Sequence, residues 1–125
     1  MRKQYHLLPS AEGLHAWDVD RLIELAQDCP VEDVSLTRVR EIDENYWFNT
    51  GFPPTVRALV DHVRLMEEAD LSFPILLDPE GRVMDGMHRV AQALRMGRSS
   101  ITARRLVTLP PPDYVGIEPD NLPGQ

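Results

Sequence analysis

The sequence has a single cysteine, Cys29, and no uninterrupted apolar segment as long as a membrane span requires. One cysteine excludes an internal disulfide and any metal site built from several thiolates. The opening residues, MRKQYHLLPS, lack the apolar segment of a secretory signal peptide. We therefore expect a cytoplasmic protein with no membrane-bound part, folded around one modest core.

An excess of positive charge is also missing. The formal net charge is −7 and the sequence pI is about 5.0, which opposes non-specific binding to nucleic acid. The basic residues are nevertheless unevenly placed, because residues 82–105 contain six arginines and only one acid, Asp85. A local basic surface in an acidic chain favours a small anionic ligand over a duplex.

Three main helices are predicted from apolar residues spaced at i, i+3, i+4 and i+7. They cover residues 19–28, 56–69 and 87–96. Asp18 and Thr55 stand where N-caps of the first two helices are expected. Trp17 and Leu22 are spaced to form a hydrophobic staple. We expect the core-facing side of the second helix to be an apolar stripe of Val56, Leu59, Val60 and Val63.

Strands are predicted where short apolar runs are bounded by turn residues. They cover residues 31–36, 73–78, 82–85 and 101–107, with a helical turn at 37–42 and a long loop at 43–54. The turn DPEG makes a β-hairpin of the second and third strands. The expected fold is a compact α+β domain over residues 1–108, with a small mixed sheet, a β-hairpin and three main helices. The proline-rich residues 109–125 form an extended C-terminal arm, partly docked through Tyr114, Val115 and Ile117.

The stretch VMDGMHRVAQALRMG, residues 83–97, carries the strongest functional signal, because a carboxylate, a glycine, an imidazole and a guanidinium meet where a strand becomes a helix. The first amides of a helix lack internal partners and favour a phosphate. Gly86 permits close approach, Arg89 can form a charge-assisted pair, and His88 can donate a hydrogen bond or move a proton. Asp85 has two suitable roles, capping the free amides or holding Mg²⁺ against phosphate.

The spacing of Met87, Val90, Ala91 and Leu94 predicts the buried face of the third helix. On that spacing His88, Arg89 and Gln92 point toward solvent or a ligand. The simpler alternative is that Asp85 caps the helix and that the histidine and arginine are ordinary surface residues.

Residues 74–106, PILLDPEGRVMDGMHRVAQALRMGRSSITARRL, resemble the ParB-like/sulfiredoxin superfamily, in which a β-hairpin carries a D-G-x-H-R loop followed by a helix, a glycine and a strand. The matching residues are Asp85, Gly86, His88, Arg89 and Gly97, and residues 29–42 resemble the upstream strand and short helix. The resemblance implies that the loop, Met87 included, binds nucleotide phosphates.

The loop is closest to the D-G-H-H-R of free serine kinases, in which an upstream acid accepts the proton of the substrate hydroxyl. The candidates for that base are Glu41, Asp43 and Glu44. Sulfiredoxins have a nucleophilic cysteine at the position of Met87, so their activity is not expected. Partition proteins have a G-E-R-R loop and a long DNA-binding region that do not match this chain.

The aromatic residues Tyr46, Trp47 and Phe48 are candidates for stacking on a base or walling a substrate, with anchoring of their own loop as the alternative. Two classes of function follow. One is phosphoryl transfer to or from a small hydroxylated metabolite with ATP, ADP or CTP and Mg²⁺, in which His88 assists catalysis. The other is a non-catalytic nucleotide-sensing module that changes shape or forms a homodimer. ParB-like DNA binding or nuclease action is a third alternative.

Overall fold

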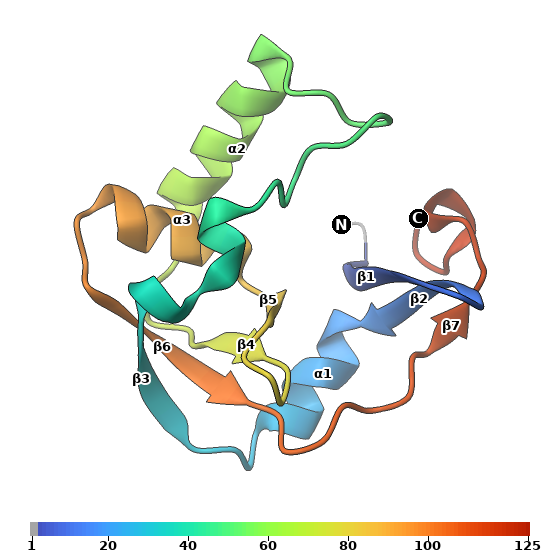
Figure 1. Ribbon diagram of the computed structural model, residues 1–125, viewed down its shortest axis with the longest axis horizontal. Coiled ribbons are helices and arrows are strands. Elements are labelled where there is room, and N and C mark those ends of the chain that lie inside the picture. Colours follow the sequence, from blue (N-terminus) through green and yellow to red (C-terminus); the bar gives the residue numbers. More distant parts are fainter. Residues whose placement is uncertain (1–2) are drawn as a thin grey trace.

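The computed structural model describes residues 3–125, which form a compact α+β domain with three helices and two small sheets (Figure 1). The helices are α1 (Val19–Ala26), α2 (Val56–Glu68) and α3 (Met87–Arg95). The strands are β1 (Tyr5–Ser10), β2 (Gly13–Asp18), β3 (Val31–Ser35), β4 (Ile75–Leu77), β5 (Val83–Asp85), β6 (Ser100–Arg105) and β7 (Tyr114–Val115). Short 3-10 helices cover Leu36–Arg38, Arg40–Asp43 and Pro119–Asn121.

The larger sheet is mixed and has the strand order β3-β6-β4-β5. Strands β4 and β6 are parallel, whereas the β3/β6 and β4/β5 pairs are antiparallel. Side chains alternate between the two faces of a strand. Ile75 and Leu77 therefore share one core cluster with Val90 of α3, whereas Leu76 belongs to another cluster with Leu22 of α1. The sheet thus lies between α3 and α1, and both clusters help to fix the turn from β5 into α3.

The caps expected from the sequence are confirmed. The Asp18 side chain accepts a hydrogen bond from the amide of Asp20, and the Thr55 hydroxyl accepts one from the amide of Ala58. Trp17 belongs to the same buried cluster as Leu22, as the staple requires. Helix α1 nevertheless ends at Ala26, two residues before the predicted end.

The second sheet, with strand order β1-β2-β7, was not predicted. Strands β1 and β2 form an antiparallel hairpin, and its turn ends at Gly13, whose φ is +111°. Tyr114 and Val115 of the C-terminal arm pair with β2, and the Trp17 indole donates a hydrogen bond to the carbonyl of Pro110. The pairing of β7 with β2 therefore extends the hairpin into a three-stranded sheet. Leu122 near the end of the arm is also buried.

The predicted core stripe of α2 is wrong. No residue of α2 is buried, and Val56 and Val60 are 79% and 58% exposed. The helix instead turns its Ala58, His62 and Met66 side inward, where each is partly buried. Amphipathicity identifies which side of a helix is apolar, but it does not identify what covers that side.

The predicted stripe of α3 is correct only in part. Met87 and Val90 are buried, but the third buried position is Ala93, and Leu94 is 51% exposed. The helix is rotated slightly from the expected orientation because Ala93 packs in the cluster that contains Ile75. Within residues 3–125, no helix is both long and apolar enough to cross a membrane.

Candidate functional site

The expected phosphate site lies at the turn between β5 and α3. Strand β5 ends at Asp85, Gly86 has φ +105°, and α3 begins at Met87. A Cβ on residue 86 would lie 2.7 Å from Ile75 Cγ2 and 2.9 Å from Arg89 Nη2. Glycine is therefore needed here for its backbone angle and for the close approach of the guanidinium.

The N-terminus of α3 has no side-chain cap. The first backbone hydrogen bond of the helix runs from the Val90 amide to the Gly86 carbonyl. In the described part of the chain, the amides of residues 87–89 have no acceptor. Asp85 does not cap them, because its carboxylate accepts a hydrogen bond from Arg89 at 2.8 Å. Three backbone donors at the positive end of the helix dipole are thus left for solvent or a ligand.

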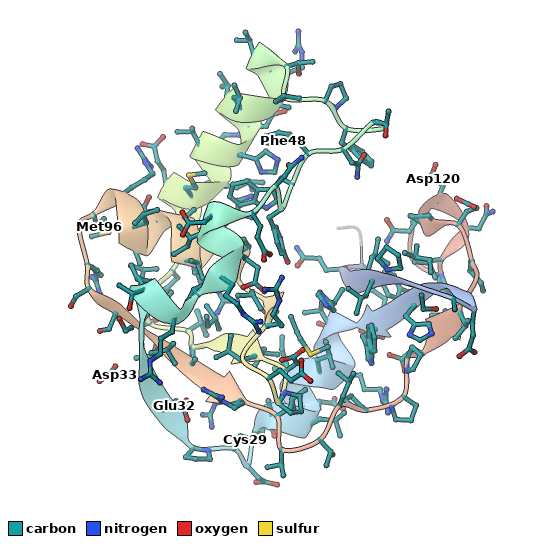
Figure 2. All side chains as sticks on the ribbon, in the orientation of Figure 1. Cys29, Glu32, Asp33, Phe48, Met96 and Asp120 are labelled. Atoms are coloured by element: carbon teal, nitrogen blue, oxygen red, sulfur yellow. The ribbon has the colours of Figure 1, made fainter. Side chains whose placement is uncertain are left out.

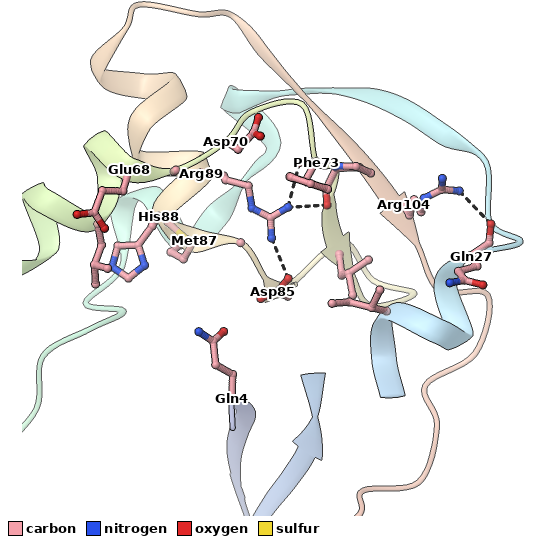
Figure 3. Close-up of a pocket in the computed structure, with 16 residues that line it drawn as sticks. Gln4, Gln27, Glu68, Asp70, Phe73, Asp85, Met87, His88, Arg89 and Arg104 are labelled. Atoms are coloured by element: carbon pink, nitrogen blue, oxygen red, sulfur yellow. Dashed lines mark hydrogen bonds and ion pairs between the residues drawn. The ribbon is translucent and has the colours of Figure 1, made fainter. Parts of the chain in front are cut away.

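A cavity of about 670 Å³ lies beside this turn (Figure 3). The first residues of α3, the end of α2, the segment before β4 and one side of α1 supply its wall, and Gln4 approaches from the opposite side. Its apolar surface comes from Ile23, Leu65, Ala69, Phe73, Pro74, Leu76 and Met87. Its charged side chains are Glu68, Asp70, Asp85, Arg89 and Arg104. The cavity is therefore amphipathic, with a polar side at the helix end.

Arg89 lies at the cavity wall with most of its donors already used. One terminal nitrogen, Nη1, donates to the carbonyls of Phe73 and Pro74 at 2.9 and 2.8 Å, and the other, Nη2, donates to Asp85 at 2.8 Å. The two side chains of the ion pair are only 16% and 17% exposed. The guanidinium therefore holds the segment before β4 and neutralises Asp85, and in this arrangement it is not aimed at an incoming phosphate.

The ionised groups of the cavity nearly balance, with three carboxylates and two guanidinium groups. A bare polyanion would meet repulsion from Glu68 and Asp70, whereas an anion carrying a divalent cation would not. Within residues 3–125, no group of three or more His, Cys, Asp or Glu side chains is arranged to hold a metal. The expected Mg²⁺ ligand Asp85 is paired with Arg89 at 2.8 Å.

His88 turns away from the helix end and forms an aromatic cluster with Trp47 and His62. Both imidazoles stack on the indole, with ring centroids 4.4 Å (His62) and 4.7 Å (His88) away. His62 Nδ1 and His88 Nε2 are 2.8 Å apart and share a hydrogen bond. Burial, helped by the neighbouring His62, lowers the pKa of His88 to about 4, and burial also lowers the pKa of His62. Both imidazoles are therefore neutral at pH 7.

The neutral His88 makes stability depend on pH. Its pKa is lower in the folded chain than the usual 6.5, so the unfolded chain binds more protons between pH 6.5 and about 4. The contribution of His88 to the free energy of unfolding is therefore fully present above pH 6.5, and it decreases as the pH falls from 6.5 to about 4. Because His88 keeps some contact with solvent, we expect this contribution to the free energy of unfolding to be about 1–2 kcal/mol. The measurement is urea unfolding at several pH values for the wild type and for His88→Asn, which should show a smaller decrease.

His15→Asn is the control for this measurement, because His15 lies in the other sheet and packs edge-on against Trp17. A decrease in His88→Asn as large as that in the wild type would show that His88 is not the group responsible.

A second hollow of about 460 Å³ lies on the other side of the histidine pair. It is bounded by the loop before α2 and by the first turns of that helix, with Trp47, Phe48 and His62 among its lining residues. Phe48 packs edge-on against His62, in the space between the loop and α2 (Figure 2). The hydrogen bond between His62 and His88 thus connects a residue of the smaller hollow with a residue of the larger cavity.

The three acids predicted as a general base are not at the cavity wall. Glu41 is 3% exposed, its Oε2 accepts a hydrogen bond from the Val83 amide at 2.7 Å, and the same oxygen forms an ion pair with Arg82 Nε at 3.3 Å. Its Oε1 has no partner in the described part of the chain. Glu44 pairs with Arg82 at 2.5 Å, which lowers the pKa of Glu44, and Asp43 is exposed. The lining of both hollows lacks all three acids.

The structure brings several unpredicted residues to the site. Glu68, Asp70 and Arg104 line the cavity, and His62 holds His88. The sequence carried no separate signal for His62, which lies four residues from Ala58 and from Met66, on the side of α2 that turns inward in the structure. Arg104 belongs to the arginine-rich residues 82–105, whereas Glu68 and Asp70 have no signal in the sequence, because they reach the cavity from the end of α2 and the segment after it. A scan against protein-family models and searches of curated proteins and of solved structures find no match to this chain.

Proposed function

We propose that this chain binds a nucleotide as its magnesium complex, with the phosphates at the N-terminus of α3. The observation that carries the proposal is the uncapped first turn of α3, because residues 87–89, whose amides have no acceptor within residues 3–125, line the cavity of about 670 Å³. Phosphate oxygens accept hydrogen bonds from such amides and interact favourably with the helix dipole. The apolar wall around Ile23, Leu65 and Phe73 suits the base and sugar.

Magnesium fits this proposal as part of the ligand rather than as a resident ion. It would neutralise phosphate charge that otherwise faces Glu68 and Asp70, and its remaining positions can be filled by water. The chain's own contribution is to position the phosphates with backbone amides and to exclude water with the apolar wall. Trp47 acts indirectly here, by holding His88 beside the cavity.

We infer further that the chain is a branch of the ParB-like/sulfiredoxin superfamily. The mixed sheet with the β4–β5 hairpin, the loop from Asp85 to Arg89 and the following helix support this assignment. Met87 is 8% exposed and packs in the core, so it replaces the reactive residue of the sulfiredoxins with an inert one.

Phosphoryl transfer is the second candidate function, favoured by one observation. Glu68 and Asp70 are carboxylates that line the same cavity as the first residues of α3 (Figure 3). Hydrogen bonds from Ser72 lower the pKa of Asp70, which makes Asp70 a weaker acceptor of a hydroxyl proton. We therefore propose Glu68, the other carboxylate of the pair, as the acceptor.

The test compares His88→Pro with His88→Ala by calorimetry. Both variants remove the imidazole, but only proline also removes one of the three amide donors, and proline is tolerated in the first turn of a helix. We expect at least one of ATP, ADP, CTP and GTP with Mg²⁺ to bind the wild type. Loss of one phosphate contact predicts about tenfold weaker binding by His88→Pro than by His88→Ala.

Arg95→Ala is the control, since Arg95 is exposed near the other end of α3 and, among residues 3–125, its side chain forms a hydrogen bond to Gln92 alone. Equal affinities of the proline and alanine variants would show that the helix amides do not hold the phosphates. Nucleotide consumption by the same samples with serine and other small alcohols then separates phosphoryl transfer from simple binding.

A further inference from the structure

Helix α2 presents an apolar side that nothing in residues 3–125 covers. Its thirteen residues include none that is buried, and the element that it contacts most is α3. Figure 1 shows α2 extending away from the two sheets, and Figure 2 shows side chains projecting from its outer side. An amphipathic helix gains stability by burying its apolar side, so this exposed side indicates a surface for association.

The exposed apolar side chains form one line along the helix. Val56, Val60 and Val63 follow each other at i, i+4 and i+7, and they are 79%, 58% and 38% exposed. Leu59 beside them is 47% exposed, and Phe52 in the preceding loop is 70% exposed. We call these five residues the α2 stripe. Ala58, His62 and Met66 pack inward on the adjoining side of α2, next to Leu59. The stripe residues farthest from that side, Val56 and Val60, are the most exposed valines of the helix.

The charged residues around the α2 stripe indicate which partner can bind to this surface. Arg57 lies at the N-terminal end of α2, and Glu67 and Glu68 lie at the C-terminal end. All three are exposed, and none forms an ion pair within the described residues. In the middle of the helix, Arg64 and Asp61 already pair with each other at 2.7 Å. The unpaired charges are therefore opposite in sign at the two ends.

We propose that the α2 stripe is the interface with a second copy of this chain, with the two α2 helices antiparallel. A two-fold axis near the middle of the helix places Val60 and Val63 of one copy against Val63 and Val60 of the other. It also places Arg57 of each copy beside Glu67 of the other, and it aligns the two helix dipoles favourably. A parallel pair would instead bring like charges together.

The proposed dimer leaves the nucleotide site open. The cavity is lined by residues of the inner side and C-terminal end of α2, such as Leu65 and Glu68, whereas the α2 stripe lies on the outer side. The helix is about 20 Å long, so the contact is at the small end of specific interfaces, and we expect a dissociation constant of about 100 µM for the dimer.

Sedimentation of the full chain between about 10 µM and 1 mM tests the proposal. We expect the wild type to change from monomer to dimer over this range. Val60→Asp should stay monomeric, because it buries a carboxylate at the centre of the contact on both copies. Val107→Asp is the matched control, since Val107 is an 84% exposed valine outside α2, and this variant should dimerise like the wild type.

Charge reversal tests the antiparallel arrangement. Arg57→Glu should weaken the dimer about tenfold, and adding Glu67→Arg to the same chain should restore the affinity, because each pair is then reversed. Circular dichroism checks that each variant keeps its helices. A wild type that stays monomeric at 1 mM, or a dimer that survives Val60→Asp, overturns the α2 interface. Failure of the double variant to recover overturns the antiparallel pairing.

Discussion

Replacing Gly86 with alanine should be among the most damaging single changes in this chain. The residue has φ +105°, and its new Cβ would lie 2.7 Å from Ile75 Cγ2 and 2.9 Å from Arg89 Nη2. Ile75 is fully buried and Arg89 is held by three hydrogen bonds, so neither can move cheaply. Backbone strain and overpacking together predict a loss of about 3–5 kcal/mol in the free energy of unfolding.

Gly97→Ala separates these two causes. Gly97 also has a positive φ, +73°, but a Cβ there would meet nothing within 4 Å. Its alanine variant therefore suffers the backbone strain alone, about 1–2 kcal/mol. Urea unfolding of the two variants and the wild type measures the difference. If the two losses were equal, the contacts of the new Cβ with Ile75 and Arg89 would add nothing to the backbone strain.

Local signals in the sequence predicted the elements that build the site. Asp18 and Thr55 are caps, the DPEG turn joins β4 and β5, and the Asp85–Gly86 pair marks the end of a strand and the start of a helix. Each signal acts within a few residues, through a side-chain hydrogen bond or a backbone angle. Local reasoning was sufficient there because the same few residues decide the structure.

The β1–β2 hairpin could not be predicted from local sequence signals. Its strands contain Leu7, Leu8 and Pro9, which do not alternate between apolar and polar, and the turn is marked only by Gly13. The pairing is completed from the far end of the chain by β7 and by the Pro110 carbonyl that accepts from Trp17. Partners about a hundred residues apart leave no periodic pattern near the hairpin.

The same limit explains which site residues were missed. His62 becomes relevant only because α2 packs with its less apolar side inward, against the expectation that Val60 and Val63 would be buried. Glu41 was expected as a base because of its charge, yet the protein uses it to bind the Val83 amide. Residue type and spacing suggested the chemistry, but tertiary packing decided which groups meet.

Removing the Arg89 side chain should lower the free energy of unfolding, because this side chain holds Asp85 and the segment before β4. Arg89→Ala leaves the Asp85 carboxylate without its partner and frees the carbonyls of Phe73 and Pro74. Breaking a buried ion pair costs about 3–5 kcal/mol. Because both side chains here keep 16–17% exposure, we expect about 2–4 kcal/mol in urea unfolding.

The double variant Arg89→Met with Asp85→Leu separates lost charge from lost anchoring. It removes both charges and keeps apolar bulk at the two positions, so it should recover much of the stability if the unpaired Asp85 carboxylate causes the loss. If it stays as unstable as Arg89→Ala, the hydrogen bonds to Phe73 and Pro74 are the more important contribution of the arginine. A loss below about 0.5 kcal/mol in Arg89→Ala, the range of ordinary surface changes, would contradict both. It would mean that the guanidinium is free to leave Asp85, and thus free to bind a phosphate directly.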